Sequence, residues 1–176
     1  APLESLAVWP VVSAFAFLFR SGGVAFQEVG IALGGPRGEH APEVRKTAFL
    51  LGGAASFLLA VVALTPLEAF WLQRLSGLSP DLAAFAVWPV RILIALPALE
   101  YLLSLQRSRW IVEQRTEIVT LATVAEAVVL TAVLFLTLGP LRMIGAAGGA
   151  LAMLAGRCAS SGFLFFAARR STAAAV

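Results

Sequence analysis

Five long apolar runs, separated by short polar connections, constrain this chain more than any other feature of its sequence. We expect helices at about 4–33, 47–72, 81–106, 115–138 and 143–168. Each expected helix is long enough for the roughly 20 residues that cross the apolar layer of a bilayer. The runs are continuous, whereas the strands of a membrane barrel alternate between apolar and polar residues. The sequence therefore predicts an all-α, polytopic membrane protein with five transmembrane helices.

The composition agrees with a membrane protein and excludes several other classes. The chain is 60% hydrophobic and 13% charged, with a mean hydropathy of +0.90, whereas soluble domains are about 25% charged. No basic stretch is interleaved with exposed aromatic residues, so we expect no nucleic-acid partner. With His40 as the only histidine and Cys158 as the only cysteine, we expect no metal, no other cofactor and no internal disulfide. A nucleophile motif of the Gly-x-Ser-x-Gly kind is also absent, and we expect no enzyme.

Lysine and arginine are distributed unevenly among the connections. From first to last, the connections contain three, one, three and one of these residues, and the tail contains two. The positive-inside rule then places the first and third connections and the tail in the cytoplasm. The N-terminus is expected outside and the C-terminus inside, in a bacterial inner membrane. Because Ala1 is not a methionine and would lie outside, we also expect a fragment that lacks a preceding helix.

The third apolar run contains two prolines and a charged residue. A helix that served only as a membrane anchor would contain neither prolines nor charges within its apolar run. Pro89 and Pro97 lie eight residues apart, with Arg91 between them. Proline removes a backbone donor and clashes with the preceding turn, so the helix should be broken. An arginine at the centre of a bilayer costs about 2.5–3.5 kcal/mol and usually marks a pathway, an ion pair or a ligand site. Arg91 is about ten residues, or roughly 15 Å, from the start of its helix.

Five other charged residues are expected at depth in the bilayer. They are Arg20, Glu28, Glu100, Glu126 and Arg157. On an ideal helix Arg91 and Glu100 are about 180° apart, so their partners should come from other helices. Two interpretations remain open, namely structural ion pairs between helices, or a central cavity in which arginines hold an anion and a glutamate carries a proton or a sodium ion.

The candidate site residues follow from these positions. No catalytic residue and no metal ligand are predicted. Arg20 and Gln27 lie within about 20° of each other on one helix face. The substrate-binding candidates are Arg20, Gln27, Pro89, Arg91 and Pro97. The ion-coupling or counter-ion candidates are Glu28, Glu100 and Glu126.

Small residues repeat every four positions on two of the expected helices. The last helix carries Gly148, Ala152, Gly156 and Ser160, and a second pair at Gly145 and Gly149. The second helix carries Gly52, Ser56 and Ala60. Such ridges let neighbouring helices approach closely, and we interpret them as packing surfaces. Thr116, Thr120 and Thr123 lie along one face of the fourth helix, where they either line a pore or bond their own preceding carbonyls.

Several short segments carry a resemblance to a known family. They are Thr65-Pro66-Leu67, Asp81-Leu82-Ala83-Ala84-Phe85, Pro89-Val90-Arg91-Ile92 and Pro97. Their order resembles the C-terminal lobe of the progressive ankylosis (ANKH) type transporters, which are relatives of the multidrug and toxin extrusion (MATE) family in the MOP superfamily. The end of the first helix, Val29 to Gly35, resembles the second helix of a lobe in the wider MATE family.

The resemblance implies a fold and a function. The family fold is two six-helix lobes around a central cleft, so this chain would be the last five helices of the second lobe. Its partners would be the first lobe, the lipid bilayer and a small-molecule substrate. Ankylosis-type proteins are implicated in the export of anionic metabolites such as citrate, nucleotides or pyrophosphate, and of the residues here only Arg91 and its flanking prolines match that pattern.

We therefore expect a secondary active transporter that exports small anionic solutes by alternating access. The alternatives are a multidrug or organic-cation antiporter, a lipid-linked glycan flippase, and a membrane scaffold that transports nothing. A scaffold would have every deep charge paired and no cavity. The coupling ion, sodium or a proton, is left open, because no carboxylate matches the family's ion sites residue by residue.

Overall fold

The computed structural model describes residues 2–34 and 40–173, which are mostly helical and contain no strand. The elements in chain order are α1 (Pro2–Gly34), α2 (Ala41–Leu64), α3 (Leu67–Ala69), the π-helical segment η1 (Phe70–Leu75), α4 (Pro80–Ile92), the 3-10 turn η2 (Leu93–Ala95), α5 (Leu96–Val112), α6 (Thr116–Leu138) and α7 (Gly145–Ala173). Five spans are long and apolar enough to cross a membrane, and α4, η2 and α5 together form the third. The predicted all-α, multi-pass membrane protein is confirmed.

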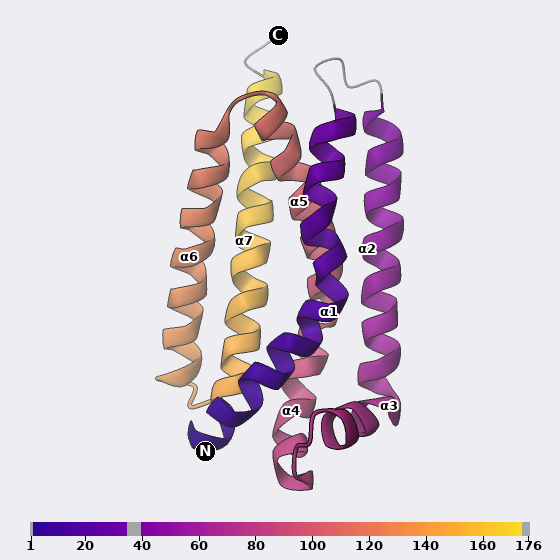
Figure 1. Cartoon of the computed structure of the whole chain (residues 1–176). Helices are drawn as coiled ribbons and strands as arrows, with labels where there is room; N and C mark the ends of the chain where they lie inside the picture. Colours follow the sequence, from indigo (N-terminus) through magenta and orange to yellow (C-terminus); the bar gives the residue numbers. More distant parts are fainter. Residues whose placement is uncertain (1, 35–39, 174–176) are drawn as a thin grey trace.

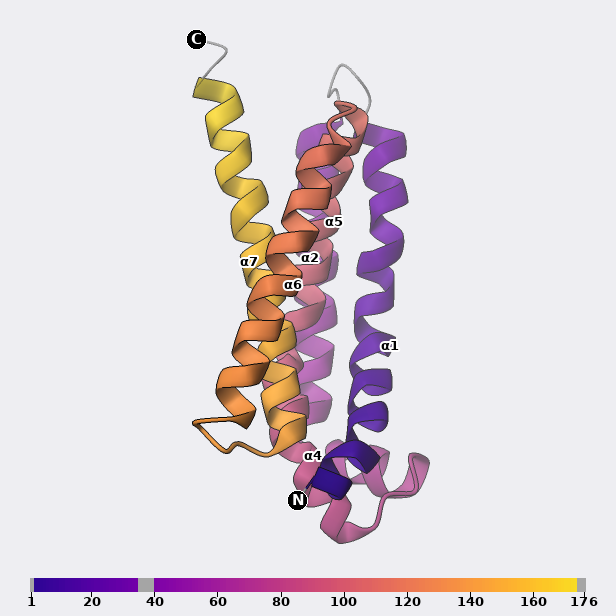
Figure 2. The same cartoon turned by 90° about the vertical axis from the view of Figure 1, so that its left-hand side faces the viewer.

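The five spans run along a common direction and leave short connections at two ends (Figure 1). The C-terminal end of α7, the end of α1, the start of α2 and the turn between α5 and α6 share one end, which we call the basic end. The N-terminus, the α3–η1 segment and the α6–α7 connection lie at the opposite end. Towards the basic end α7 leans away from α2 and α5 (Figure 2). The connections predicted to be cytoplasmic therefore share one end, and their side of the bilayer stays a prediction.

The second helix differs from its expected range of 47–72. It begins at Ala41, with Pro42 in its first turn. Proline fits there because the first N–H groups of a helix have no acceptor within the helix, so the missing donor costs nothing. It ends at Leu64, because Thr65 precedes a proline and is extended, with φ −120° and ψ 170°. Residues 67–75 form α3 and η1 after the span has ended.

The third span is broken where the prolines predict. The chain passes from α4 through the 3-10 turn η2 to α5, and the amide of Ala98 donates to Ser56 Oγ of α2 at 3.0 Å. This bond satisfies a donor next to the break that would otherwise be buried and unpaired. The span ends at Val112, six residues beyond the expected 106, and an Arg109–Glu113 pair at 2.9 Å supports its last turn. Arg107, expected in a connection, therefore lies on the helix.

The ridges of small residues pack as predicted. A Cβ atom on Gly148 would lie 3.2 Å from Thr137 Cβ of α6, and one on Gly156 would lie 3.1 Å from the Glu126 carbonyl oxygen. Gly149 faces Trp9 of α1 on another side of α7. These close approaches place α7 between α1 and α6, with its backbone near both.

Glycines also bring α1 against α5. A Cβ atom on Gly23 would lie 3.0 Å from Glu100 Cβ, and one on Gly30 would lie 2.7 Å from Ser108 Cβ. Ser104 Oγ donates to the carbonyl of Gly23 at 2.6 Å. Gly22 lies against Tyr101 in the same way, so both glycines let the α1 backbone approach α5. The close packing holds the middle of α1 beside Glu100 of α5.

Candidate functional site

Five charged side chains from four helices form a continuous chain of ion pairs, which we call the central ion-pair chain. Arg20 of α1 lies 3.0 Å from Glu100 of α5, and Arg157 of α7 lies 3.6 Å from the other oxygen of Glu100. Arg157 also lies 3.3 Å from Glu126 of α6, which in turn accepts from Arg107 of α5 at 3.1 Å. The chain thus runs Arg20–Glu100–Arg157–Glu126–Arg107 and joins α1, α5, α6 and α7.

The central ion-pair chain lies deep in the bundle. Glu100 is twelve residues before the end of α5, and Arg157 is twelve residues after the start of α7. At 1.5 Å per residue, each is roughly 18 Å from that end of its helix, which is near the centre of an apolar layer about 30 Å thick. The Glu100 side chain is 4% exposed and that of Arg157 is 15% exposed. Charges at this depth are weakly screened, so their interactions are strong and long-ranged.

The central ion-pair chain has an excess of one positive charge. It contains three guanidinium groups and two carboxylates. Arg107 Nε is buried and has no hydrogen-bond partner in the described part of the molecule. Guanidinium groups present several donors in a planar fork that matches carboxylate and phosphate oxygens. The arrangement can therefore bind one more anionic group without first breaking an existing pair.

A cavity of about 890 Å³ opens at the basic end, between α1, α2, α5 and α7. Its polar lining includes Arg45 of α2 and Gln106, Ser108 and Arg109 of α5. Gln106 Oε1 is buried without a partner among the described residues. Gln106 is six residues, or roughly 9 Å, along α5 from Glu100. The cavity thus lies on the basic side of the central ion-pair chain.

The opposite side of the central ion-pair chain is filled with apolar side chains. A cluster of fully buried residues from α1, α2, α4 and α7 includes Val8, Leu59, Ala86, Val90 and Ala150. Trp71 of η1 packs on Phe15 of α1, with ring centroids 4.9 Å apart. The bundle is therefore hollow at the basic end and packed at the other.

Arg91 belongs to a separate ion pair. Its guanidinium lies 3.4 Å from Glu68 Oε2 of α3, and its side chain is 40% exposed. The second carboxylate oxygen of Glu68 is buried without a partner among the described residues. Burial raises the pKa of Glu68, and the nearby Arg91 partly opposes that rise. As the helix angles predict, Arg91 has a partner from another element and not Glu100.

The other predicted site residues lie outside both groups. Pro89 and Pro97 are fully buried and shape the broken span. Gln27 is half-buried and Glu28 is exposed, and neither belongs to the central ion-pair chain. Thr120 and Thr123 are exposed and donate to the carbonyls of Thr116 and Val119, so they bond their own helix.

The structure brings together three of the predicted residues, Arg20, Glu100 and Glu126, and adds two arginines. Arg157 was expected at depth but was not a site candidate, and Arg107 lay beyond the expected end of its helix at residue 106. One signal could have found Arg107: it lies seven residues after Glu100, about 20° away on a helical wheel, provided that the helix continues past residue 106. Glu68 was not among the candidates, because it lies near the end of the second apolar run, close to the expected outer surface of the bilayer.

No known family model, curated protein or solved structure shows a significant match to this chain. The functional argument therefore depends on the geometry of the molecule, above all on the buried charges and the cavity beside them.

Proposed function

We propose that this chain forms part of a secondary active transporter that moves small anionic solutes across the membrane by alternating access. One observation carries the proposal: a central ion-pair chain with one excess positive charge lies between a cavity open at the basic end and a packed apolar region at the other end. A low-dielectric site with an uncompensated cation favours an anion over a neutral solute or a cation.

The cavity reaches Gln106, the residue next to Arg107 in α5, and we propose that an anion passes from it to the arginines. Arg45 at its lining attracts an anion from the basic end, which the positive-inside rule places in the cytoplasm, while Arg109 is paired with Glu113. Arg107 has an unused donor, and Arg20 pairs with Glu100 and has an aromatic neighbour, Phe17, whose ring centroid is 5.0 Å from the guanidinium carbon. An anionic oxygen can first bind the unused donor of Arg107, and it then competes with Glu126 and Glu100 for the remaining donors of the arginines.

The same ion pairs connect two groups of helices. Arg157–Glu100 and Arg107–Glu126 each join α5 to the α6–α7 pair. A substrate that replaces a carboxylate in one of these pairs loosens the connection, which lets α6 and α7 move against α1, α2 and α5. Protonation of Glu100 or Glu126, or binding of sodium there, has the same effect and supplies a means of coupling.

The resemblance to ankylosis-type and MATE-type transporters supports the same proposal from the sequence. On that mapping a first lobe covers the side of this chain on which α4 exposes Arg91. Arg91 and Trp88 are exposed on α4, which is the arrangement expected of residues that face a cleft between two lobes. We propose Arg91 as a second anion contact on that face.

A membrane scaffold is the strongest competing function. In the described part of the chain each member of the central ion-pair chain has a partner, as a scaffold requires. A scaffold does not require a cavity of about 890 Å³ beside the charges, nor a charge excess. These two features favour transport.

The test is uptake of radiolabelled anions by the full-length protein in vesicles, with citrate, pyrophosphate and a nucleotide as probes. Arg20→Gln leaves two arginines and two carboxylates, so the central ion-pair chain becomes neutral. Glu100 still has Arg157 as a cationic partner in this variant. We expect it to lower uptake at least tenfold without unfolding the protein. Arg74→Gln, an exposed residue at the other end, is the matched control. Equal uptake by Arg20→Gln and the unmodified protein, or no uptake of any probe by a folded protein, would contradict the proposal.

A further inference from the structure

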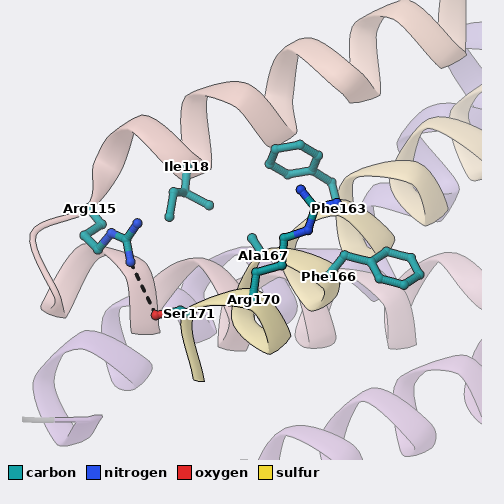
Figure 3. A pocket seen from close by; sticks show the side chains of 7 residues that line it. All are labelled: Arg115, Ile118, Phe163, Phe166, Ala167, Arg170 and Ser171. Carbon is teal, nitrogen blue, oxygen red and sulfur yellow. Dashed lines mark hydrogen bonds between the residues drawn. The ribbon is translucent and has the colours of Figure 1, made fainter. Parts of the chain in front are cut away.

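A second cavity, of about 670 Å³, lies between the start of α6 and the end of α7 at the basic end (Figure 3). Two arginines, Arg115 and Arg170, line it together with Ser171. The rest of its lining is apolar, from Ile118 of α6 and Phe163, Phe166 and Ala167 of α7. We call this cavity the α6–α7 groove.

Polar and apolar lining groups of the α6–α7 groove are separated along the helix axis. Arg170 is seven residues after Phe163, so the two lie roughly 10 Å apart along α7. Arg115 immediately precedes α6, and Ile118 lies within its first turn. The arginines thus lie where the spans end, and the apolar residues extend towards the bilayer centre. This is the order of a lipid's head group and acyl chains.

The positive charge of the groove is largely uncompensated. Arg170 is exposed and makes no ion pair within the described residues. Arg115 donates to Ser171 Oγ at 3.4 Å and lies 3.5 Å from Glu117, and both members of the latter pair are largely exposed, at 47% and 62%. Exposed pairs of this kind contribute little and exchange readily. Two guanidinium groups with one peripheral carboxylate leave the groove positive.

We propose that the α6–α7 groove binds an anionic phospholipid. The phosphate oxygens bind Arg115 and Arg170 and accept from Ser171, and one acyl chain lies along Phe163, Phe166 and Ile118. A zwitterionic lipid carries a cationic amine that the arginines repel, so the groove distinguishes the two by charge. This site is separate from the central ion-pair chain and does not depend on the proposed transport function.

The test is retention of lipid by the purified protein, measured by native mass spectrometry after exchange into mixed micelles of phosphatidylglycerol and phosphatidylcholine. We expect the unmodified protein to retain phosphatidylglycerol preferentially. The double variant Arg115→Gln/Arg170→Gln should retain at least tenfold less phosphatidylglycerol than the unmodified protein. The control is Arg169→Gln, because Arg169 lies over Phe165 at 4.6 Å and does not line the groove. Undiminished retention by the double variant, or equal retention of both lipids, would overturn the proposal.

A measurement on the unmodified protein removes any dependence on how the variant folds. Phosphatidylglycerol should raise the thermal unfolding midpoint, since a ligand that binds the folded state stabilises it. Phosphatidylcholine should raise it less. If inorganic phosphate at millimolar concentration displaces the retained phosphatidylglycerol completely, the groove is a site for free anions and the proposal of a lipid site is wrong.

Discussion

Arg20 and Glu100 are eighty positions apart in the chain, yet their guanidinium and carboxylate groups lie 3.0 Å from each other in the centre of the bundle. The contact depends on the backbone of α1 lying against that of α5, where Gly23 leaves room for the Glu100 side chain. Glu100 also holds Arg157 of α7, so a single carboxylate connects three helices. This makes Glu100 the residue whose loss should affect the bundle most.

Glu100→Gln should destabilise the protein strongly. Arg20 then loses its carboxylate partner, and Arg157 keeps only Glu126. Removing one partner of a buried pair costs about 3–5 kcal/mol. The measurement is thermal unfolding of the purified protein in detergent. Glu113→Gln is the control, because Glu113 is 37% exposed in its pair with Arg109. Similar midpoints for the two variants would contradict the assignment of Glu100 as the central link.

Arg91→Ala should abolish anion uptake while leaving the fold intact. Its pair with Glu68 is long, at 3.4 Å, and its side chain is 40% exposed, so the guanidinium has donors free for an anion. Glu68, whose side chain is 10% exposed, can take up a proton once Arg91 is removed, because burial already raises its pKa, so the fold should survive the loss of the pair. Uptake in vesicles and the unfolding midpoint are measured on the same preparation. A variant that transports normally would show that Arg91 is not an anion contact.

Gly30→Ala should destabilise the contact between α1 and α5. The new methyl group would lie 2.7 Å from Ser108 Cβ, closer than real side chains approach, and overpacking of this kind costs about 1–3 kcal/mol. Gly53→Ala is a matched control on α2, where a Cβ atom meets nothing within 4 Å. Chemical or thermal unfolding in detergent compares the two. Equal stabilities would mean that α1 and α5 are not in close contact.

Glu68 should make stability depend on pH. Because burial raises its pKa in the folded protein above the ordinary value of 4.5, the folded state holds the proton more tightly than the unfolded state. The resulting stabilisation is complete below pH 4.5 and is lost as the pH rises through the folded-state pKa, at no more than about 1.4 kcal/mol per pH unit.

Glu68→Gln should remove this dependence, since glutamine resembles the protonated acid at every pH. Unfolding midpoints of the variant and the unmodified protein, followed from pH 4 to pH 8, should diverge in favour of the variant as the pH rises. Glu117→Gln, on an exposed residue, serves as the control and should follow the unmodified protein. A difference that is constant with pH would show that Glu68 keeps its ordinary pKa.

The sequence by itself determined the class of protein, the five spans and the break near Pro97. Continuous apolar runs have few stable alternatives to membrane helices, because every backbone polar group must be satisfied within the bilayer. Proline acts through its own missing donor, so its effect can be read locally. The ridge of small residues on α7 was also correctly interpreted as a packing surface, although the sequence could not tell which helices it contacts.

Only the tertiary structure decided how the deep charges are arranged. Whether Arg20 meets Glu100 or another carboxylate depends on the rotation and depth of α1 relative to α5, which hydropathy does not encode. Arg107 joined the central ion-pair chain because α5 continues past the expected end, and Glu68 met Arg91 because the chain turns at Thr65. The cavity likewise exists because α7 leans away from α2 and α5 (Figure 2). Pairing and space depend on helix positions in three dimensions, and distant parts of the chain set those positions together.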